Sequence, residues 1–207
     1  GGTSAEREVS LWTAKSVANA LTLLKEEFAE IDAADADWLD QVVGYNPKVV
    51  IIALHGPFGE DGTVQKALEE KGIRYTGSNS ATSKVAINKN RTKEIAQSLG
   101  INLATSRLFK KGEEVVWNRE FPVVVKPNGD GSSFGVTIVK NSEDLQKAAE
   151  NAFAYGEEIL LEDFIPGVEL SCGVVQKGTE LTALPLVEIR PGEEFFNFEA
   201  KYNESKC

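Results

Sequence analysis

The sequence predicts a mixed α/β protein with two parts, a parallel α/β part followed by an antiparallel α+β part. The first part is indicated by "KVVIIAL" at 48–54, a continuous β-branched run typical of a strand buried on both faces of a parallel sheet. A helix pattern and a second strand pattern follow it, which together predict a βαβ unit. The second part is indicated by strand-like runs on either side of glycine-containing turns, which favour antiparallel hairpins.

The N-terminal part begins with a predicted helix over 3–28, where apolar residues drift along one face and Thr3 with Glu6 fits a capping box. After the strand at 48–54, we expect a short amphipathic helix at 63–72, closed by Gly72, and then a strand at 73–77. This order predicts a small, open, Rossmann-like α/β domain over residues 1–88.

The second part alternates strands and helices without an internal repeat. A loop rich in glycine and serine connects its second and third strands. We expect helices at 88–100 and 141–153, the latter capped by Ser142, strands at 102–109, 121–127, 134–139 and 157–165, and a hairpin over 168–189 that turns at Lys177-Gly178.

The connecting loop, "KPNGDGSSFGV" at 126–136, has the composition of an anion-binding loop. Glycine allows close backbone approach, and successive free N–H groups can hold a phosphate. The loop is not a Walker loop, and Gly129, Gly131 and Gly135 miss the dinucleotide-binding spacing by one residue. The residues alone leave two readings open: a loop over ATP phosphates, or a plain hairpin turn with a solvated lysine.

Composition excludes several classes of function. The chain has 207 residues and a formal net charge of −10, which argues against nucleic acid or an anionic membrane as a partner. Its two cysteines form no disulfide framework or metal-ligand spacing, and no apolar run is long enough to span a bilayer. We therefore expect a cytoplasmic protein. Because methionine is absent and no closing element is readable before Cys207, we also expect a piece of a longer chain.

Four stretches carry a resemblance to a known family. "GGTSAEREVSL", "ALHGPFGEDGTVQ", "VVVKPNGDGSSFGV" and "FFNFEAKY" occur in the order and rough spacing of D-alanine–D-alanine ligases, which are ATP-grasp enzymes. The resemblance implies a substrate-binding domain at 1–88, a small ATP-grasp lobe with a glycine-rich flap at 89–165, and the truncated start of the larger lobe at 166–207. It implies ATP-dependent formation of D-alanyl-D-alanine through an acyl phosphate, for peptidoglycan synthesis.

The resemblance also implies an ATP site. Taken singly, its residues are better explained as solvated or packed side chains, and only the family assigns them to ATP. The phosphates would be bound by Lys89, Lys126, Gly131, Ser132 and Ser133, adenine by Glu162, Asp163 and Ile165, the ribose by Glu169, and the adenine face by Phe195.

The substrate residues implied by the resemblance include one with a competing structural role. Glu6 would receive the ammonium of the first D-alanine and be linked to Ser132 and Tyr202 as the catalytic group, although a capping box also explains it. His55, the only histidine, follows the strand at 48–54 and would orient the carboxylate of that D-alanine. The intact pair Lys201-Tyr202 favours a second D-alanine over D-lactate as the acceptor.

The expected ligands are ATP, D-alanine and Mg²⁺ or Mn²⁺, and the family's metal ligands would lie beyond Cys207. A homodimer is one oligomeric state that the resemblance allows. Departures from the family pattern occur at Asn88, Phe134, Phe196 and Phe198. The alternatives are another ATP-grasp carboxylate–amine ligase, including a D-alanine–D-lactate ligase, and a nucleotide-binding homologue without turnover. We expect residues 1–207 alone to be inactive.

Overall fold

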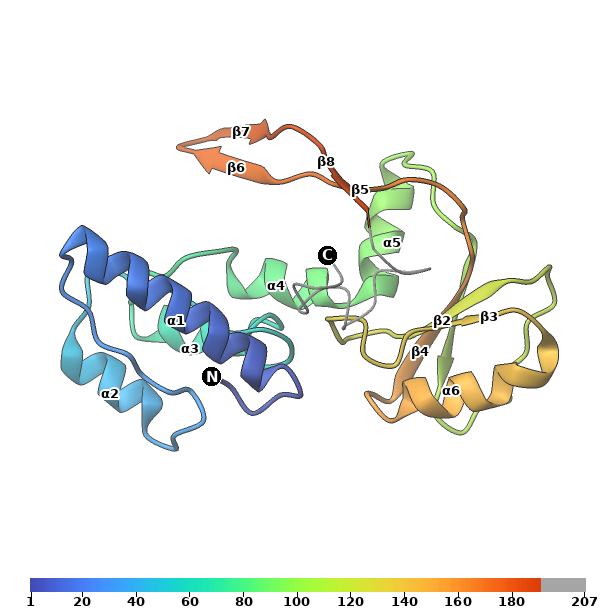
Figure 1. The fold of residues 1–207 in the computed structure, drawn as a ribbon, viewed down its shortest axis with the longest axis horizontal. Coiled ribbons are helices and arrows are strands. Elements are labelled where there is room, and N and C mark those ends of the chain that lie inside the picture. The colour runs from blue at the N-terminus through green and yellow to red at the C-terminus, as the bar shows by residue number, and fades with distance from the viewer. Residues whose placement is uncertain (191–207) are drawn as a thin grey trace.

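A computed structural model describes residues 1–190 of the chain, which form two groups of elements joined by a helix, α4 (Figure 1). Helices α1 to α3 make up the first group, and the second contains α5, α6 and a four-stranded sheet. The helices are α1 (Arg7–Leu24), α2 (Trp38–Tyr45), α3 (Thr63–Glu70), α4 (Ser80–Ile87), α5 (Lys89–Ser98) and α6 (Leu145–Phe153), with one 3₁₀ turn, η1 (Ser142–Asp144). The strands are β1 (Ser106–Lys110), β2 (Val123–Pro127), β3 (Thr137–Val139), β4 (Glu158–Asp163), β5 (Glu169–Ser171), β6 (Val174–Lys177), β7 (Glu180–Ala183) and β8 (Val187–Ile189).

The sequence predicted two parallel strands at 48–54 and 73–77, and this prediction is wrong, because neither segment forms a regular strand. They meet in a single isolated parallel bridge, between Val50 and Tyr75. The segment at 48–54 is buried on one face only: Val50 packs against the core formed by Val42, Val64 and Leu68, whereas Val49 is 46% exposed and Ile51 is 42% exposed. Successive side chains of an extended segment point to opposite faces, and in the described chain only one of these faces is well covered. The fold is therefore mixed α/β, with the parallel pairing reduced to this bridge.

Helix α1 begins four residues later than predicted, at Arg7, and it ends at Leu24. The capping box between Thr3 and Glu6 is wrong: Glu6 occupies the N-cap position, but its side chain makes no capping hydrogen bond. Its backbone N–H instead donates to Ser4 Oγ at 3.2 Å. The Glu6 carboxylate is therefore available for another role.

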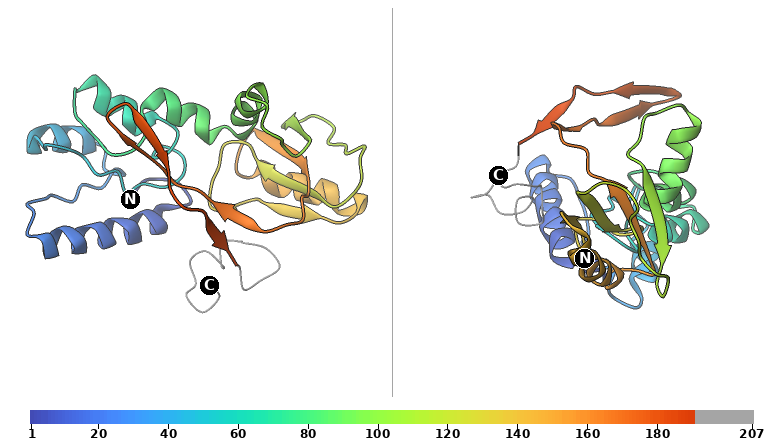
Figure 2. Two further views of the ribbon diagram at one scale, coloured as in Figure 1. Left: turned by 90° about the horizontal axis from the view of Figure 1, so that it is seen from above. Right: turned by 90° about the vertical axis from the view of Figure 1, so that its right-hand side faces the viewer.

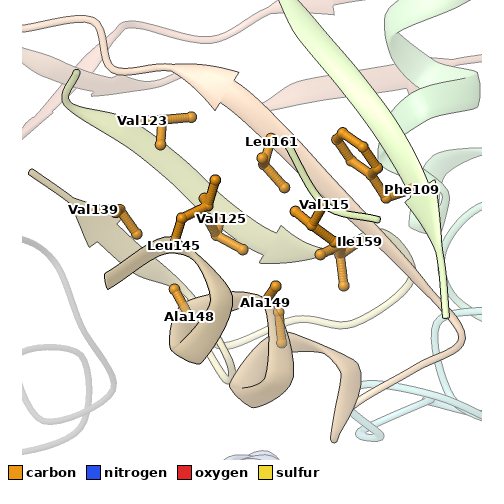
Figure 3. Close-up of a cluster of buried hydrophobic side chains, with 11 residues drawn as sticks. Phe109, Val115, Val123, Val125, Val139, Leu145, Ala148, Ala149, Ile159 and Leu161 are labelled. Carbon is orange, nitrogen blue, oxygen red and sulfur yellow. The ribbon is translucent and has the colours of Figure 1, made fainter. Parts of the chain in front are cut away.

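The second group is organised around an antiparallel sheet with the strand order β1-β4-β2-β3. Helix α6 packs against β2, β3 and β4, so the main apolar core lies between this helix and one face of the sheet (Figure 3). The predicted strand–loop–strand around 126–136 is confirmed by the pairing of β2 with β3. The side chains of this core are Phe109, Val115, Val123, Val125, Val139, Leu145, Ala148, Ala149, Ala152, Ile159 and Leu161.

Asparagine side chains cap two helical elements, at Asn141 and Asn79, that the sequence patterns did not place correctly. The predicted Ser142 cap is wrong, because the Asn141 side chain accepts hydrogen bonds from the N–H groups of Glu143 and Asp144. Helices α2 and α4 were not predicted. Helix α4 is rich in serine, threonine and β-branched residues, which have modest helix propensity. Asn79 caps it by accepting from Thr82 N at 2.8 Å, a signal that was readable in the sequence.

The predicted hairpin over 168–189 is confirmed. Strands β5 and β8 pair at its base, β6 and β7 pair at its tip, and Gly178 takes a positive φ of 63° in the turn. The hairpin extends away from the four-stranded sheet (Figures 1 and 2). In the part of the chain that the structure describes, no helix is both long enough and apolar enough to cross a membrane.

Candidate active site

Strand alternation separates the core of the second group from a charged surface. Val125 and Leu161 face each other in the β2–β4 register and point into the core under α6. Their neighbours Lys126 and Glu162 must therefore point to the opposite face, because successive side chains of a strand alternate. There the Lys126 ammonium donates to Glu162 Oε1. This face of the sheet is where charged side chains gather.

Helix α5 brings further lysines to this face. Asn88 caps the helix by accepting from Arg91 N at 2.8 Å, so asparagine serves as well as aspartate at this position. Lys89, at the first helical position, donates to the backbone carbonyl of Asp130 in the glycine loop. Lys93 lies one turn further on and donates to Glu162 Oε2 at 3.0 Å. The helix thus connects the glycine loop with the charged face of the sheet.

The charges in this cluster act on one another. Burial lowers the pKa of Lys89 to about 8, and the positive charge of Lys126 adds to this effect. Asp130, Glu162 and Glu6 favour the charged form of Lys89 and oppose the shift. Burial tends to raise the pKa of Glu162, but Lys126 and Lys93 outweigh it and hold this pKa below its ordinary value. The cluster is therefore a partly buried site that gathers three lysine ammonium groups, two of them on the Glu162 carboxylate and one on the glycine loop.

The glycine loop reaches from the sheet to the N-terminal segment. Ser132 and Ser133 have positive φ values of 47° and 62°. This region is uncommon for residues other than glycine, and such residues concentrate at functional loops. The Ser132 hydroxyl donates to Glu6 Oε1, across 126 residues of sequence. A loop with the composition of an anion site therefore contacts a carboxylate that precedes α1.

Glu6 is enclosed almost completely. Glu6 is only 2% exposed, and its Oε2 atom accepts no hydrogen bond from any of the described residues. Burial raises the pKa of Glu6, the hydrogen bond from Ser132 lowers it, and the carboxylates of Glu60 and Asp130 raise it. A buried carboxylate oxygen without a donor is costly, and a cationic ligand would relieve this cost.

His55 lies beside this carboxylate. Its Nε2 is within hydrogen-bond distance of Thr13 Oγ1, at 2.8 Å, and its Nδ1 lies 3.4 Å from Glu60 Oε1. The backbone is held as well, because His55 N donates to Ser10 Oγ at 3.0 Å and His55 O accepts from Ser4 Oγ at 3.1 Å. These contacts fix the imidazole between α1 and the loop at 55–62.

Gly56 is required for this arrangement. It has a positive φ of 71°, and a Cβ atom at this position would lie 2.1 Å from Glu6 Oε2. We expect Gly56→Ala to displace the Glu6 carboxylate and to lower any activity that depends on it, in addition to destabilising the fold. Gly72→Ala is the matched control, because Gly72 has a φ of 67° and no atom within 4 Å of the added Cβ.

Both variants carry a similar backbone penalty of about 1 kcal/mol, so the difference between them reports the contact with Glu6. Thermal unfolding and substrate affinity should be measured for each. Equal losses of substrate affinity in the two variants would show that the Glu6 position does not matter.

Several predicted site residues lie apart from this cluster or outside the described residues. Asp163 forms a two-point ion pair with Arg119, at 3.0 and 2.8 Å, and its backbone N–H donates to Thr105 O. Ile165 is 67% exposed, and Glu169 is exposed on β5. The residues Phe195, Lys201 and Tyr202, with the departures Phe196 and Phe198, lie outside the described residues.

Two residues of the cluster were missed by the sequence analysis. Lys93 follows Lys89 by four residues, a spacing that places both on one face of α5, and this signal was readable. Asn128 is 3% exposed; it accepts from Asn90 N at 2.9 Å and donates to Glu158 Oε2 at 2.9 Å. It joins the start of α5 to the end of β2, and no sequence pattern marks this contact.

The described residues do not offer a metal site. Within residues 1–190, no three His, Cys, Asp or Glu side chains come together in a way that could hold a metal ion. Glu162 is paired with two lysines, and Glu6 has a single oxygen, Oε2, without a donor, so the cluster does not supply the several oxygen ligands that a divalent cation needs. The described residues therefore do not fit a metal ion.

Comparison with family models gives two matches. Residues 24–78 match the model described as "D-ala D-ala ligase N-terminus", and residues 85–207 match "D-ala D-ala ligase C-terminus". Among curated proteins, a D-alanine–D-alanine ligase of Citrifermentans bemidjiense is 42% identical over 99% of this chain, which spans 65% of that protein. One of Aquifex aeolicus is also 42% identical, over 99% of this chain and 69% of its own length.

Solved structures show the same likeness. A Bacillus anthracis D-alanine–D-alanine ligase complexed with ATP aligns with a TM-score of 0.79 and 34% identity, over 95% of this chain and 66% of that one. The VanG D-Ala:D-Ser ligase of Enterococcus faecalis aligns with a TM-score of 0.77 and 27% identity, over 100% of this chain and 71% of that one.

Proposed function

We propose that the full-length protein joins two D-alanines into D-alanyl-D-alanine at the expense of ATP, since this chain belongs to the D-alanine–D-alanine ligase family. The chain spans 65% of the length of two of its curated relatives, so the activity is proposed for a chain of their full length. The reaction would pass through an acyl phosphate and supply peptidoglycan synthesis. Mg²⁺ or Mn²⁺ is the proposed metal, with its ligands beyond Cys207 as the family resemblance implies, and it would supply charge neutralisation at the phosphates when bound.

The main support for this proposal is the hydrogen bond from the Ser132 hydroxyl to the Glu6 carboxylate. It joins a loop suited to phosphates to a buried carboxylate suited to an ammonium group. Lys89 and Lys126 lie on the loop side, and His55 lies on the carboxylate side. A ligase of this kind needs both reactants held together, because positioning removes much of the entropic cost of a reaction between two bound molecules.

On the ATP side, we assign Lys89 and Lys126 to the phosphates. Phosphoryl transfer depends on neutralising the charge of the phosphate oxygens, and ammonium groups in a water-poor site do this effectively. The backbone N–H groups of Gly131, Ser132 and Ser133 would add donors as the loop closes. Glu162, Asp163, Ile165, Glu169 and Phe195 remain the proposed adenine and ribose residues.

On the D-alanine side, we assign Glu6 to the ammonium and His55 to the carboxylate of the first substrate. The assignment of Glu6 is supported by its enclosed Oε2, which a substrate ammonium would provide with a donor. Ser132 and Tyr202 would complete the link that closes the loop over the substrate. This arrangement would exclude water from the acyl phosphate, which water would otherwise hydrolyse.

The acceptor is predicted to be a second D-alanine. The motivation is the intact Lys201-Tyr202 pair, which lies outside the described residues. In a competition assay near neutral pH with equal D-alanine and D-lactate, we expect mainly the dipeptide, measured by mass spectrometry of the products. A predominance of the depsipeptide would show that this pair does not set the acceptor, and absence of any product would favour a nucleotide-binding homologue without turnover.

A further inference from the structure

Lys93 has no role in the function proposed above, yet it is bound at the centre of the charged cluster. Its ammonium donates to Glu162 Oε2 at 3.0 Å and to the backbone carbonyl of Ala104 at 2.9 Å. The exposed fractions of the two side chains in this ion pair are 18% for Lys93 and 15% for Glu162. Removing one partner of a mostly buried ion pair leaves the other charge uncompensated and is strongly destabilising, whereas an exposed ion pair contributes little to stability.

The Glu162 carboxylate is shared between two lysines, one on each oxygen. Lys126 donates to Oε1 and Lys93 donates to Oε2. If Lys126 turned from Glu162 toward a phosphate, Oε1 would lose its cation. A mostly buried carboxylate without a counter-ion is strongly unfavourable, so this movement would be opposed unless another cation stayed with Glu162. Lys93 is the cation that remains.

The second contact of Lys93 supports this division of roles. Because the carbonyl of Ala104 precedes β1 and also accepts from Lys93, the ammonium is held by two acceptors from different segments. Lys126, by contrast, lies near the end of β2, where the glycine loop begins. One lysine is anchored to the sheet, and the other is next to the proposed phosphate loop.

We propose that Lys93 is a positioning residue for ATP binding: it neutralises Glu162 so that Lys126 can leave this carboxylate for a phosphate. The proposal rests on the proposed function only in that ATP is the ligand. It predicts that loss of Lys93 leaves Glu162 with Lys126 alone. Lys126 would then be held on the carboxylate, and the cluster would attract phosphate less.

The test compares Lys93→Met, Lys93→Arg and the control Lys66→Met in the full-length protein. Lys66 forms an exposed ion pair with Glu70 at 3.9 Å on α3, so its removal deletes a lysine charge without touching the cluster. Affinity for ATP is measured by calorimetry without D-alanine, together with the melting temperature. We expect Lys93→Met to weaken ATP binding by about tenfold, or about 1.4 kcal/mol, Lys93→Arg to restore most of it, and Lys66→Met to change it little.

A double-mutant cycle with Glu162→Gln separates positioning from a general effect of charge. If Lys93 acts through Glu162, Lys93→Met weakens ATP binding much less in the Glu162→Gln background, where the carboxylate is absent. Equal losses in both backgrounds, or a lower melting temperature with unchanged ATP affinity, would overturn the proposal. A wild-type protein that binds ATP but does not ligate D-alanine would contradict the proposed function while leaving this test valid. A protein that does not bind ATP would overturn both.

Discussion

Replacement of Glu6 by glutamine in the full-length protein is expected to lower the affinity for D-alanine by at least 100-fold while the fold is kept. Glutamine preserves the shape of the side chain and can still accept from Ser132, but it cannot pair with an ammonium group. Removing one partner of a buried ion pair typically costs about 3–5 kcal/mol, which corresponds to roughly 100-fold or more. The measurement is the KM for D-alanine from phosphate release, with the KM for ATP recorded alongside.

The control for this variant is Glu8→Gln, an exposed carboxylate in the first turn of α1. It removes the same charge two residues away and should leave both constants unchanged. If Glu6→Gln affected the KM for ATP and D-alanine equally, the carboxylate would be a structural group of the loop rather than a substrate site.

Glu6 also predicts a pH dependence of stability. Burial raises its pKa in the folded protein, so the folded chain keeps the proton to a higher pH than the unfolded chain does. The free energy of unfolding of the wild type should therefore fall, relative to Glu6→Gln, as the pH rises above the ordinary carboxyl pKa of 4.5. Chemical denaturation of both proteins at several pH values between 4 and 7, about the range where the shift acts, tests this sign.

The second large effect is expected at Lys126. Lys126→Ala should raise the KM for ATP or lower the turnover number by at least about tenfold, because a charge-assisted hydrogen bond contributes about 1.5–3 kcal/mol. The fold should persist, since Glu162 keeps its contact with Lys93. Steady-state kinetics with varied ATP at saturating D-alanine measures the effect, and circular dichroism checks the fold.

Lys110→Ala is the control for Lys126→Ala. Lys110 lies at the exposed end of β1 in the same sheet, away from the contact with Glu162. Its removal should leave the kinetics for ATP unchanged. If Lys126→Ala had the kinetics of the wild type, the loop at 126–136 would be an ordinary hairpin turn and not a phosphate-binding loop.

The antiparallel part of the fold was predictable from the sequence because its signals are local. The runs around Val125 and Ile138 are β-branched, and the glycine-containing loop at 126–136 separates them. The parallel part was not, because a continuous apolar run such as 48–54 indicates burial without saying whether a neighbouring strand pairs with it. Its pairing depends on contacts between distant segments, and here these reduce to one bridge at Val50.

The parts of the candidate site that lie in sequence motifs could be predicted, and the parts that depend on tertiary contacts could not. The motif around Lys126 and Ser132 indicated a loop for phosphates, and the structure brings this loop to Glu6. The capping box proposed for Glu6 had a plausible local pattern, but the carboxylate is instead engaged by a residue 126 positions away. Lys93 was missed because a lysine on a helix is most often solvated, and only the tertiary structure brings its ammonium to Glu162 on β4 and to the Ala104 carbonyl.

We propose that the glycine loop and Glu6 form one site that couples ATP to D-alanine. The most direct measurement is phosphate release by the full-length protein with ATP and Mg²⁺, with and without D-alanine, while D-alanyl-D-alanine is quantified in the same sample. We expect phosphate release that depends on D-alanine, with one dipeptide formed for each phosphate, and loss of both in Ser132→Ala combined with Glu6→Gln. Phosphate release that is indifferent to D-alanine, or a double variant as active as the wild type, would contradict it.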